Sequence, residues 1–263
     1  MKVSIITVSF NCRLTIGDTL RSVSAQHHPD IEHIVVDGAS SDGTLDVVRR
    51  EGGHVAKVVT EPDAGIYDAM NKGLRLATGD LVGFLNADDV FADREAVARL
   101  AASASRVEAD AVFGDLAYVR SDSLSSVVRY WVSGEFSPRR LRLGWMPPHP
   151  TFYISRRTLA TCGEFDTSLR IASDYDFMMR CLTRRGVRTA YVPHVIVRMR
   201  MGGISNRSIG SMLDKSREDL AVMRRHGIGG WPTLVCKNLR KLPQFVTSVP
   251  ITADSTNSSK RSR

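Results

Sequence analysis

The sequence is poor in cysteine and has no long apolar run. Its 263 residues include four cysteines, which lie far apart and form no Cys-x-x-Cys pair. This spacing argues against a structural zinc site and against a disulfide framework, and four reduced thiols fit a cytoplasmic location. We find no run of 18 apolar residues and therefore expect no membrane span. The first apolar run is soon interrupted by Ser9, Asn11 and Arg13, which argues against a signal peptide.

Two function classes are disfavoured by what is missing. No Gly-x-Gly-x-x-Gly follows the first apolar run, where VSFNCRL stands instead, and this argues against a dinucleotide-dependent oxidoreductase. Aromatic residues make up only 7% of the chain and do not alternate with the basic ones. We therefore expect no nucleic-acid partner, although the isoelectric point is about 9.6.

The net charge of +8 is unevenly distributed. After Gly203 the chain carries eleven Lys or Arg residues against four Asp or Glu residues, while the first hundred residues are close to balanced. A basic segment of this kind favours an anionic partner such as a nucleotide or a phospholipid surface. The alternative is a solvated charged face without a partner.

Apolar runs typical of buried strands alternate with helical patterns in the first 85 residues. Strands are expected at residues 3–10, 31–37, 55–60 and 81–85, and helices around 16–23, 44–50 and 66–77. This alternation predicts an α/β fold with a mostly parallel central sheet and helices on its faces. Ligands of such sheets bind beyond the carboxyl ends of the strands. We therefore expect the polar residues at those ends to share one crevice: Ser9, Asn11, Asp37, Asn86, Asp88 and Asp89.

The second half is less regular. Residues 138–150 are expected to form a loop. Strands are expected at residues 110–119, 127–132, 151–155 and 191–199, the last with a proline break, and helices at about 175–185 and 207–226.

An acidic pair gives the strongest local signal for chemistry. The segment GDLVGFLNADD (79–89) carries a buried strand directly into Asp88 and Asp89. Hard divalent cations prefer oxygen ligands and usually take one or two protein carboxylates together with phosphate oxygens. The alternative is that one of these carboxylates caps a helix starting near Arg94.

Two glycine-containing segments are candidates for contacts with a nucleotide. In IVVDGASSDGT (34–44), Asp37 ends a strand and could accept hydrogen bonds from a base or ribose, whereas Asp42-Gly43 is also typical of a simple turn. In EPDAGIYDAMNKG (61–73), Gly65 allows close backbone approach, and the helix that follows could face a phosphate. Lys72 could add a positive charge, or the segment could be an ordinary solvated helix.

Two further candidates lie in the second half. Asp174 and Asp176 open an apolar helix, and two positions on a helix differ by about 200° of rotation, so only one of them can point into a site. The alternative is that Ser173 or Asp174 caps this helix. In MPPHPTFY (146–153) prolines frame His149, which could contact phosphate or an acceptor, or could simply pack.

Taken together, these segments resemble the family 2 glycosyltransferases, which have the GT-A fold. The resemblance is carried by five motifs in order between residues 3 and about 200: VSIITVSFN, IVVDGASSDGT, EPDAGIYDAMNKG, GDLVGFLNADD and ASDYDFMMR. The third motif and HPTFYISR resemble the subgroup that builds bacterial exopolysaccharides and glycolipids. This implies a glycosyltransferase domain at 1–203, with a nucleotide-sugar half to about 115 and an acceptor half beyond it. We expect a basic helical extension at 204–250 and a disordered tail at 251–263.

The resemblance also implies roles for individual residues. Asp174 matches the catalytic base of an inverting transfer, and Asp88 and Asp89 match the motif that binds Mn²⁺ or Mg²⁺ and the diphosphate. The chain has Gly38 where the family commonly has a second Asp, and Asn86 where Asp is common, so the metal is expected to depend mostly on Asp89. His149 and Asp176 are candidates for acceptor or phosphate contacts. The expected donor-binding residues are Thr7, Ser9, Asn11, Asp37, Gly65, Asp68, Lys72 and Asp88.

The expected partners follow from this interpretation. The donor is a nucleoside-diphosphate sugar, and the acceptor is a saccharide or a lipid-linked saccharide. The basic C-terminal region favours an anionic membrane surface at the inner face of the cell membrane. A sugar nucleotidyltransferase and a catalytically inactive nucleotide-sugar-binding protein are the alternatives.

Overall fold

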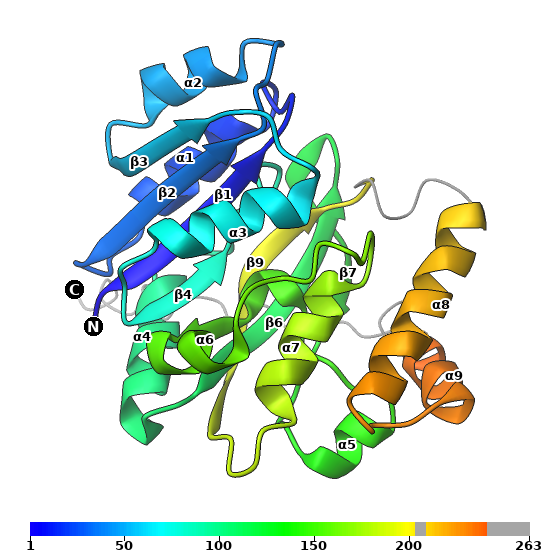
Figure 1. The fold of residues 1–263 in the computed structure, drawn as a ribbon. Coiled ribbons are helices and arrows are strands. Elements are labelled where there is room, and N and C mark those ends of the chain that lie inside the picture. Colours follow the sequence, from blue (N-terminus) through cyan, green and yellow to red (C-terminus); the bar gives the residue numbers. More distant parts are fainter. Residues whose placement is uncertain (203–208, 241–263) are drawn as a thin grey trace, which may run out of the picture.

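The computed structural model describes residues 1–202 and 209–240 and shows an α/β fold built on one large sheet (Figure 1). Strands β1 to β4 pair in parallel, which confirms the expected βαβ units. Beyond β4 the sheet is mixed: β8 pairs antiparallel with both β4 and β6, whereas β6 and β9 run parallel. The order across the sheet is β3 (Val55–Thr60), β2 (Ile31–Asp37), β1 (Val3–Ser9), β4 (Leu81–Phe84), β8 (Tyr153–Ser155), β6 (Ala111–Arg120), β9 (Thr189–Arg200) and β5 (Val90–Phe91), with β7 (Ser123–Trp131) beside β6.

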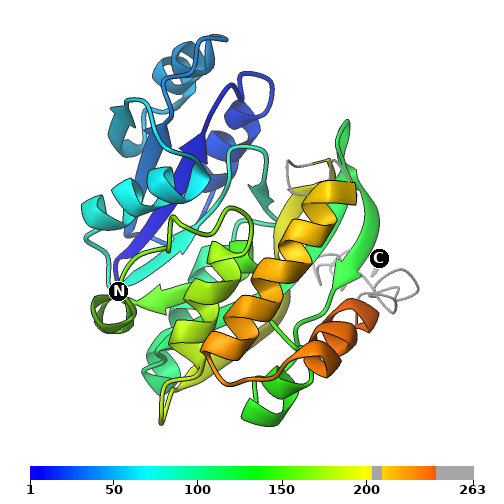
Figure 2. The same cartoon turned by 45° about the vertical axis from the view of Figure 1, so that its right-hand side comes forward.

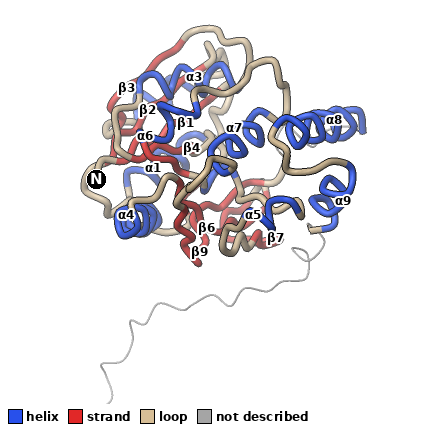
Figure 3. Tube along the Cα trace, turned by 60° about the horizontal axis from the view of Figure 1, so that its bottom comes forward, coloured by secondary structure: helices blue, strands red, loops and turns tan. Residues whose placement is uncertain are grey.

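Helices cover both faces of this sheet. Figure 3 shows α3 and α7 on one side of the strands and α1 and α4 on the other. The helices are α1 (Ile16–Ser24), α2 (Thr44–Glu51), α3 (Ile66–Leu76), α4 (Ala96–Val107), α5 (Pro138–Arg142), α6 (Arg156–Cys162), α7 (Ser173–Leu182), α8 (Ile209–Arg225) and α9 (Trp231–Leu239), with a 3₁₀ turn at His149–Thr151.

Side chains alternate between the two faces of each strand, and this places an apolar layer on each face of the sheet. Ile6 in β1 and Ile34 in β2 pack in one cluster with residues of α3 and α7, whereas Ile5 in β1 packs in a second cluster with residues of α4. Successive strand residues point to opposite faces, so a strand that is covered on both sides is apolar throughout. This explains why the first strand reads as a continuous apolar run.

The second half corrects one expectation and explains another. Residues 138–150 are not a plain loop, because Pro138 opens the short helix α5 and the Ser137 side chain accepts a hydrogen bond from the Arg140 backbone N–H at 3.2 Å. The expected proline break in the last strand is a bulge. Gly114 pairs with Val192 and the next residue, Asp115, pairs with Val195, so the residues between them leave the ladder while β9 continues.

The C-terminal helices belong to the main core. Figure 2 shows α8 lying along α7 with α9 beside it, and Leu220, Met223 and Leu234 share an apolar cluster with Phe177 of α7. The expected disordered tail at 251–263 lies outside the described residues. In the part of the chain that the structure describes, no helix has both the length and the hydrophobicity needed to span a bilayer.

Candidate functional site

Asp37 joins the carboxyl ends of three neighbouring strands. Its buried carboxylate accepts hydrogen bonds from Ser9 Oγ at 2.9 Å, from the Ser40 backbone N–H at 2.8 Å and from Thr60 Oγ1 at 3.2 Å. These residues lie at or just beyond the ends of β1, β2 and β3. The sequence-predicted pair of Ser9 and Asp37 is therefore brought together, and both side chains are used to hold the strand ends in place.

The other two predicted residues of the first motif lie in different surroundings. Asn11 has a positive φ of 51°, and its side-chain oxygen accepts from the Ser41 backbone N–H at 3.0 Å, which ties the loop after β1 to the loop after β2. The Thr7 hydroxyl is fully buried and lies 2.9 Å from His33 Nε2. Thr7 therefore links β1 to β2, and a donor contact through its hydroxyl would require His33 to move.

A carboxylate that was not among the predicted site residues, that of Asp63, lies beside Gly38. A Cβ atom on Gly38 would lie 2.4 Å from Asp63 Oδ2, so the Asp63 carboxylate fills the space that a side chain at position 38 would need. The Asp63 side chain also accepts from the Gly65 backbone N–H at 2.9 Å. The exposed residue Phe10 also lies near Gly38, with its Cδ2 atom 3.4 Å from where that Cβ would be. The only sequence signal for Asp63 was its place in the third motif.

The loop before α3 is held by two of the predicted donor-binding residues. Gly65 has a φ of 123°, which favours glycine, and α3 begins directly after it. Asp68 accepts from the Ala64 backbone N–H at 3.1 Å, and Lys72 donates to the Pro62 carbonyl at 2.8 Å while pairing with Glu61 at 3.0 Å. Asp68 and Lys72 therefore shape the loop at the start of α3.

The two residues of the acidic pair after β4, Asp88 and Asp89, differ in burial. Asp89 is fully buried, and its Oδ1 lies 3.3 Å from the backbone N–H of Arg200, whereas Asp88 is half-buried. Arg200 also donates to the Asp88 carbonyl at 2.6 Å and pairs with Asp18. Burial raises the pKa of Asp88, and burial followed by the nearby Asp88 charge raises the pKa of Asp89 well above its usual range. No sequence signal pointed to Arg200.

Neither member of this pair caps the helix that follows. The N-cap residue of α4 is Glu95, whose side chain makes no capping hydrogen bond, and Asp93 accepts from the Glu95 backbone N–H at 2.8 Å before the helix begins. The alternative interpretation of the acidic pair as a helix cap is therefore not observed.

The acidic segment fits a cation that is bound together with a diphosphate. The half-buried Asp88 carboxylate lies at the strand end, and Asn86 Oδ1 is buried without a hydrogen-bond partner in residues 1–202 and 209–240. One carboxylate, an amide oxygen and phosphate oxygens form the kind of oxygen set that Mg²⁺ and Mn²⁺ take. No group of three or more His, Cys, Asp or Glu side chains in the described ranges could hold a metal ion. Oxygens of the diphosphate would therefore be needed.

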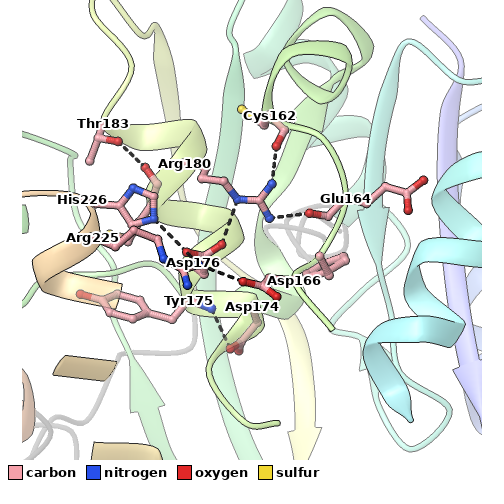
Figure 4. A network of polar contacts seen from close by, with 12 residues as sticks. Cys162, Glu164, Asp166, Asp174, Tyr175, Asp176, Arg180, Thr183, Arg225 and His226 are labelled. Atoms are coloured by element: carbon pink, nitrogen blue, oxygen red, sulfur yellow. Dashed lines mark hydrogen bonds and ion pairs between the residues drawn. The ribbon is translucent and has the colours of Figure 1, made fainter. Parts of the chain in front are cut away.

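Asp174 and Asp176 face opposite sides of α7. Asp174 is half-exposed; its Oδ1 accepts from the Tyr175 backbone N–H at 2.7 Å and lies 3.4 Å from the hydroxyl of Tyr67 in α3. Asp176 is buried among Arg180, Arg225 and His226 (Figure 4), at 2.9, 3.1 and 2.9 Å. Burial alone would raise the pKa of Asp176, but these partners, led by His226, hold it below its usual value.

This geometry agrees with the rotation expected from the sequence. An acceptor contact through Asp176 would require its ion pairs to open, whereas Asp174 needs no such change.

The start of α7 is held by a residue from α8. The Glu218 carboxylate accepts hydrogen bonds from the backbone N–H groups of Arg170, Ile171 and Ala172 at 3.0, 2.9 and 2.8 Å. The N-cap residue of α7 is Ala172, so the alternative in which Ser173 or Asp174 is the N-cap is not observed. Glu218 could not be predicted from the sequence, because a contact across 46 to 48 residues leaves no local pattern.

His149 is buried close to the start of α7. Its ring stacks on Phe84 with 5.5 Å between ring centroids and meets the edge of Phe165 at 5.8 Å. Burial lowers the pKa of His149, and the charge of Asp174 partly offsets this. The Nε2 atom has no hydrogen-bond partner among the described residues. A buried polar atom without a partner is costly, which is consistent with a contact to a ligand.

These features together define a class of protein. Parallel strands end in a polar edge, an acidic segment suited to a cation and diphosphate follows one of them, and a half-exposed carboxylate opens a helix of the second half. This is the layout of a transferase that takes a group from an activated nucleotide.

Comparison with known proteins gives the family. Residues 4–168 match the family model for Glycosyl transferase family 2. Over 251 residues the chain is 32% identical to the PGL/p-HBAD biosynthesis glycosyltransferase of Mycobacterium tuberculosis, covering 93% of this chain and 92% of that relative. A shorter stretch of 92 residues is 45% identical to the putative teichuronic acid biosynthesis glycosyltransferase TuaG of Bacillus subtilis, covering 33% of this chain and 36% of TuaG. The chain is therefore a glycosyltransferase of family 2.

Solved structures show the same fold. TarS of S. aureus (residues 1–349), in complex with UDP-GlcNAc, matches with a TM-score of 0.69 at 21% identity, covering 87% of this chain and 66% of TarS 1–349. The mannosyltransferase PcManGT from Pyrobaculum calidifontis, in complex with GDP-Man and Mn²⁺, matches with a TM-score of 0.65 at 22% identity, covering 93% of this chain and 73% of PcManGT. The expected GT-A fold is confirmed.

Proposed function

We propose that the protein is an inverting glycosyltransferase in which Asp174 is the catalytic base. The observation that carries this proposal is the difference between the two carboxylates of α7. Asp174 is half-exposed and its Oδ1 lies 3.4 Å from Tyr67 of the donor-half helix α3, whereas Asp176 is buried in ion pairs. A general base must be able to reach the acceptor, and the partial exposure of Asp174 supports this role.

The reaction is a single displacement at the anomeric carbon. Asp174 takes the proton from the acceptor hydroxyl, and the acceptor oxygen forms a bond to C1 as the bond from C1 to the diphosphate oxygen breaks. The electron pair of that bond leaves with the nucleoside diphosphate, and attack from the opposite face inverts C1. A positioned base of this kind contributes about 10²–10⁴-fold to the rate.

The acidic segment stabilises the negative charge on the leaving diphosphate by holding a divalent cation. We assign the direct metal contact to Asp88, because Asp89 is fully buried against Arg200 and is better placed to hold the segment in shape. A bound Mn²⁺ or Mg²⁺ ion supplies Lewis-acid stabilisation of the leaving group. The PcManGT complex contains Mn²⁺, which supports a divalent cation here.

The donor is a nucleoside-diphosphate sugar. This is supported by the complexes of TarS with UDP-GlcNAc and of PcManGT with GDP-Man. In this chain the polar edge held by Asp37, Ser9 and Asn11 and the loop at Gly65, held by Asp68 and Lys72, form the side on which the nucleotide would bind.

The acceptor is a saccharide or a lipid-linked saccharide, with His149 as a contact. The relatives named for PGL/p-HBAD and teichuronic acid biosynthesis support a role in glycolipid or polysaccharide assembly. A lipid-linked acceptor would place the enzyme at the cytoplasmic face of the cell membrane, where its basic C-terminal quarter meets anionic lipid.

The assignment of Asp174 is tested with a charge-removing variant. Asp174→Asn should lower kcat by about 10²–10⁴-fold while the Kd for the donor diphosphate stays within twofold, because only the proton acceptor is lost. Calorimetry with UDP, GDP and dTDP, with and without Mn²⁺, would first identify the nucleotide. Asp122→Asn, at an exposed turn between β6 and β7, is the matched control. Near-normal turnover of Asp174→Asn would show that another group is the base.

A further inference from the structure

Helix α9 presents its apolar side outward and its charge inward. Trp231, Val235 and Leu239 follow each other at intervals of four residues, and their side chains are 62%, 53% and 56% exposed. The only charged residue of the helix, Lys237, is 5% exposed. A surface helix of a water-soluble protein normally shows the opposite arrangement.

Specific contacts fix this orientation. Lys237 Nζ lies 2.8 Å from Asp219 Oδ1 in α8 and 3.5 Å from the ring centroid of Tyr175 in α7. Leu234 is buried in the main apolar cluster. A Cβ on Gly144 would lie 2.5 Å from the Lys237 backbone, so the chain after α5 also presses against α9. The exposure of the apolar stripe therefore follows from how α9 is held.

Basic and apolar residues next to the stripe extend it. Thr233 Oγ1 donates to the Arg142 carbonyl at 3.0 Å, and Arg240 Nε donates to the Leu143 carbonyl at 3.1 Å, so the end of α5 lies directly beside α9. The sequences of α5 and α9 contain no Asp or Glu. The α5–α9 surface consists of exposed Arg142, Leu143, Trp231, Val235, Leu239 and Arg240.

We propose that the α5–α9 surface binds an anionic lipid bilayer. Apolar side chains with a Trp enter the boundary between headgroups and acyl chains, while arginines beside them pair with lipid phosphates. An exposed apolar patch bordered by positive charge is the pattern of such a contact. The inference deepens the proposed function by locating the contact that a lipid-linked acceptor would need, but vesicle binding tests it without any assay of glycosyl transfer.

Charge complementarity favours lipid over a second copy of the chain. In a twofold dimer through this surface, α5 and α9 of one copy would meet α5 and α9 of the other, and neither helix has a carboxylate to pair with Arg142 or Arg240. Lipid phosphates supply the missing negative charge.

The test is co-sedimentation of the full-length protein with vesicles. We expect binding to phosphatidylcholine vesicles that contain phosphatidylglycerol and much weaker binding to phosphatidylcholine alone. Trp231→Ser/Leu239→Ser and Arg142→Glu/Arg240→Glu should each lower the partition coefficient by at least about tenfold. The matched controls on α8, Leu213→Ser and Arg217→Glu, change exposed residues of the same kinds and should bind as the wild type does.

Several results would overturn the proposal. These are equal binding by surface and control variants, or no binding of the wild type to the anionic vesicles. Light scattering that shows a dimer lost in Trp231→Ser/Leu239→Ser would assign the surface to a second copy instead. Binding of the donor nucleotide is measured in every variant. A variant that still binds the nucleotide has an intact fold. If the wild type does not bind the nucleotide, the proposed function is contradicted, but the vesicle result still holds.

Discussion

Burial separates the two members of each acidic pair at the scale of single residues. In α7, Asp174 is half-exposed while Asp176 is enclosed by basic side chains. After β4, Asp88 is half-buried while Asp89 is fully buried beside Arg200. In each pair, one Asp carboxylate is accessible to a ligand, and the other is buried and has a structural role. The two residues are two positions apart in α7 and adjacent after β4.

The split between Asp88 and Asp89 leads to a first prediction. Asp88→Asn should weaken Mn²⁺-dependent binding of the nucleoside diphosphate by at least about tenfold with little change in Tm, because it removes a charge at the ligand side. Asp89→Asn should instead lower the free energy of unfolding by about 1–3 kcal/mol, since it disturbs a buried hydrogen-bonded group. Calorimetry and thermal unfolding measure the two effects. The reverse pattern would return the metal contact to Asp89.

His33 gives a prediction on pH. Burial, followed by the neighbouring His54, lowers the pKa of His33 to about 3 from an ordinary value of 6.5. The folded state therefore favours the neutral ring, and its contribution to stability is present above about pH 6.5 and is lost as the pH falls towards 3. His33→Gln should make the free energy of unfolding less dependent on pH in this window, as measured by urea unfolding at several pH values. His28→Gln, near the surface, is the control, and parallel pH profiles for wild type and His33→Gln would contradict the assignment.

At the scale of elements, a side chain of α8 holds the start of α7 in place through hydrogen bonds. Glu218 accepts three backbone hydrogen bonds from residues 170–172. The hydroxyl of Tyr67 reaches the same turn, donating to the Ile171 carbonyl at 2.6 Å. Asp174 therefore stands on a turn that is fixed from two sides, by α3 and by α8.

Glu218 is accordingly expected to be a positioning residue. Glu218→Ala should lower kcat by about tenfold, equivalent to roughly 1.4 kcal/mol, while the Kd for the donor is unchanged, because the turn that carries Asp174 loses its acceptor. Glu218→Gln should restore part of the rate through its amide oxygen. Asp214→Asn on the exposed side of α8 is the control. If Glu218→Ala changed stability but not kcat, its role would be structural only.

At the scale of the whole molecule, the C-terminal helices complete the core. The sequence predicts a basic helical extension at 204–250, and within its described part Leu220, Met223 and Leu234 pack in the cluster that contains residues of α3 and α7. The buried pair of Lys237 and Asp219 lies between α9 and α8. We therefore expect residues 1–202 and 209–240 to unfold as one unit.

Lys237 tests this expectation. Lys237→Met leaves Asp219 buried without its partner and should cost about 3–5 kcal/mol, whereas Lys237→Met/Asp219→Leu should recover most of the loss. Urea unfolding followed by far-UV circular dichroism and by tryptophan fluorescence should give coincident curves for the wild type. Arg217→Met on the exposed side of α8 is the control. Two separate transitions would mean that the C-terminal helices form an independent unit.

The local physics of the chain explains which parts of the site the sequence could predict. Strand ends follow from the points at which continuous apolar runs stop, and neighbouring parallel strands bring Ser9 and Asp37 together at one edge. The opposed directions of Asp174 and Asp176 follow from the rotation per residue of a helix. Arg200 and Glu218 could not be predicted, because they reach the site across more than forty residues and such contacts leave no periodicity.

The sequence by itself determined the alternating strands and helices, the acidic segment at the end of β4 and the single carboxylate that faces outward from α7. It also determined the family, through five motifs in order. Only the tertiary structure decided that Asp63 fills the space beside Gly38, that Asp89 is buried against Arg200, and that α9 turns its apolar side outward. The physical reason is that each of these depends on which side chains meet across the fold, and a packed interior leaves room for only one arrangement.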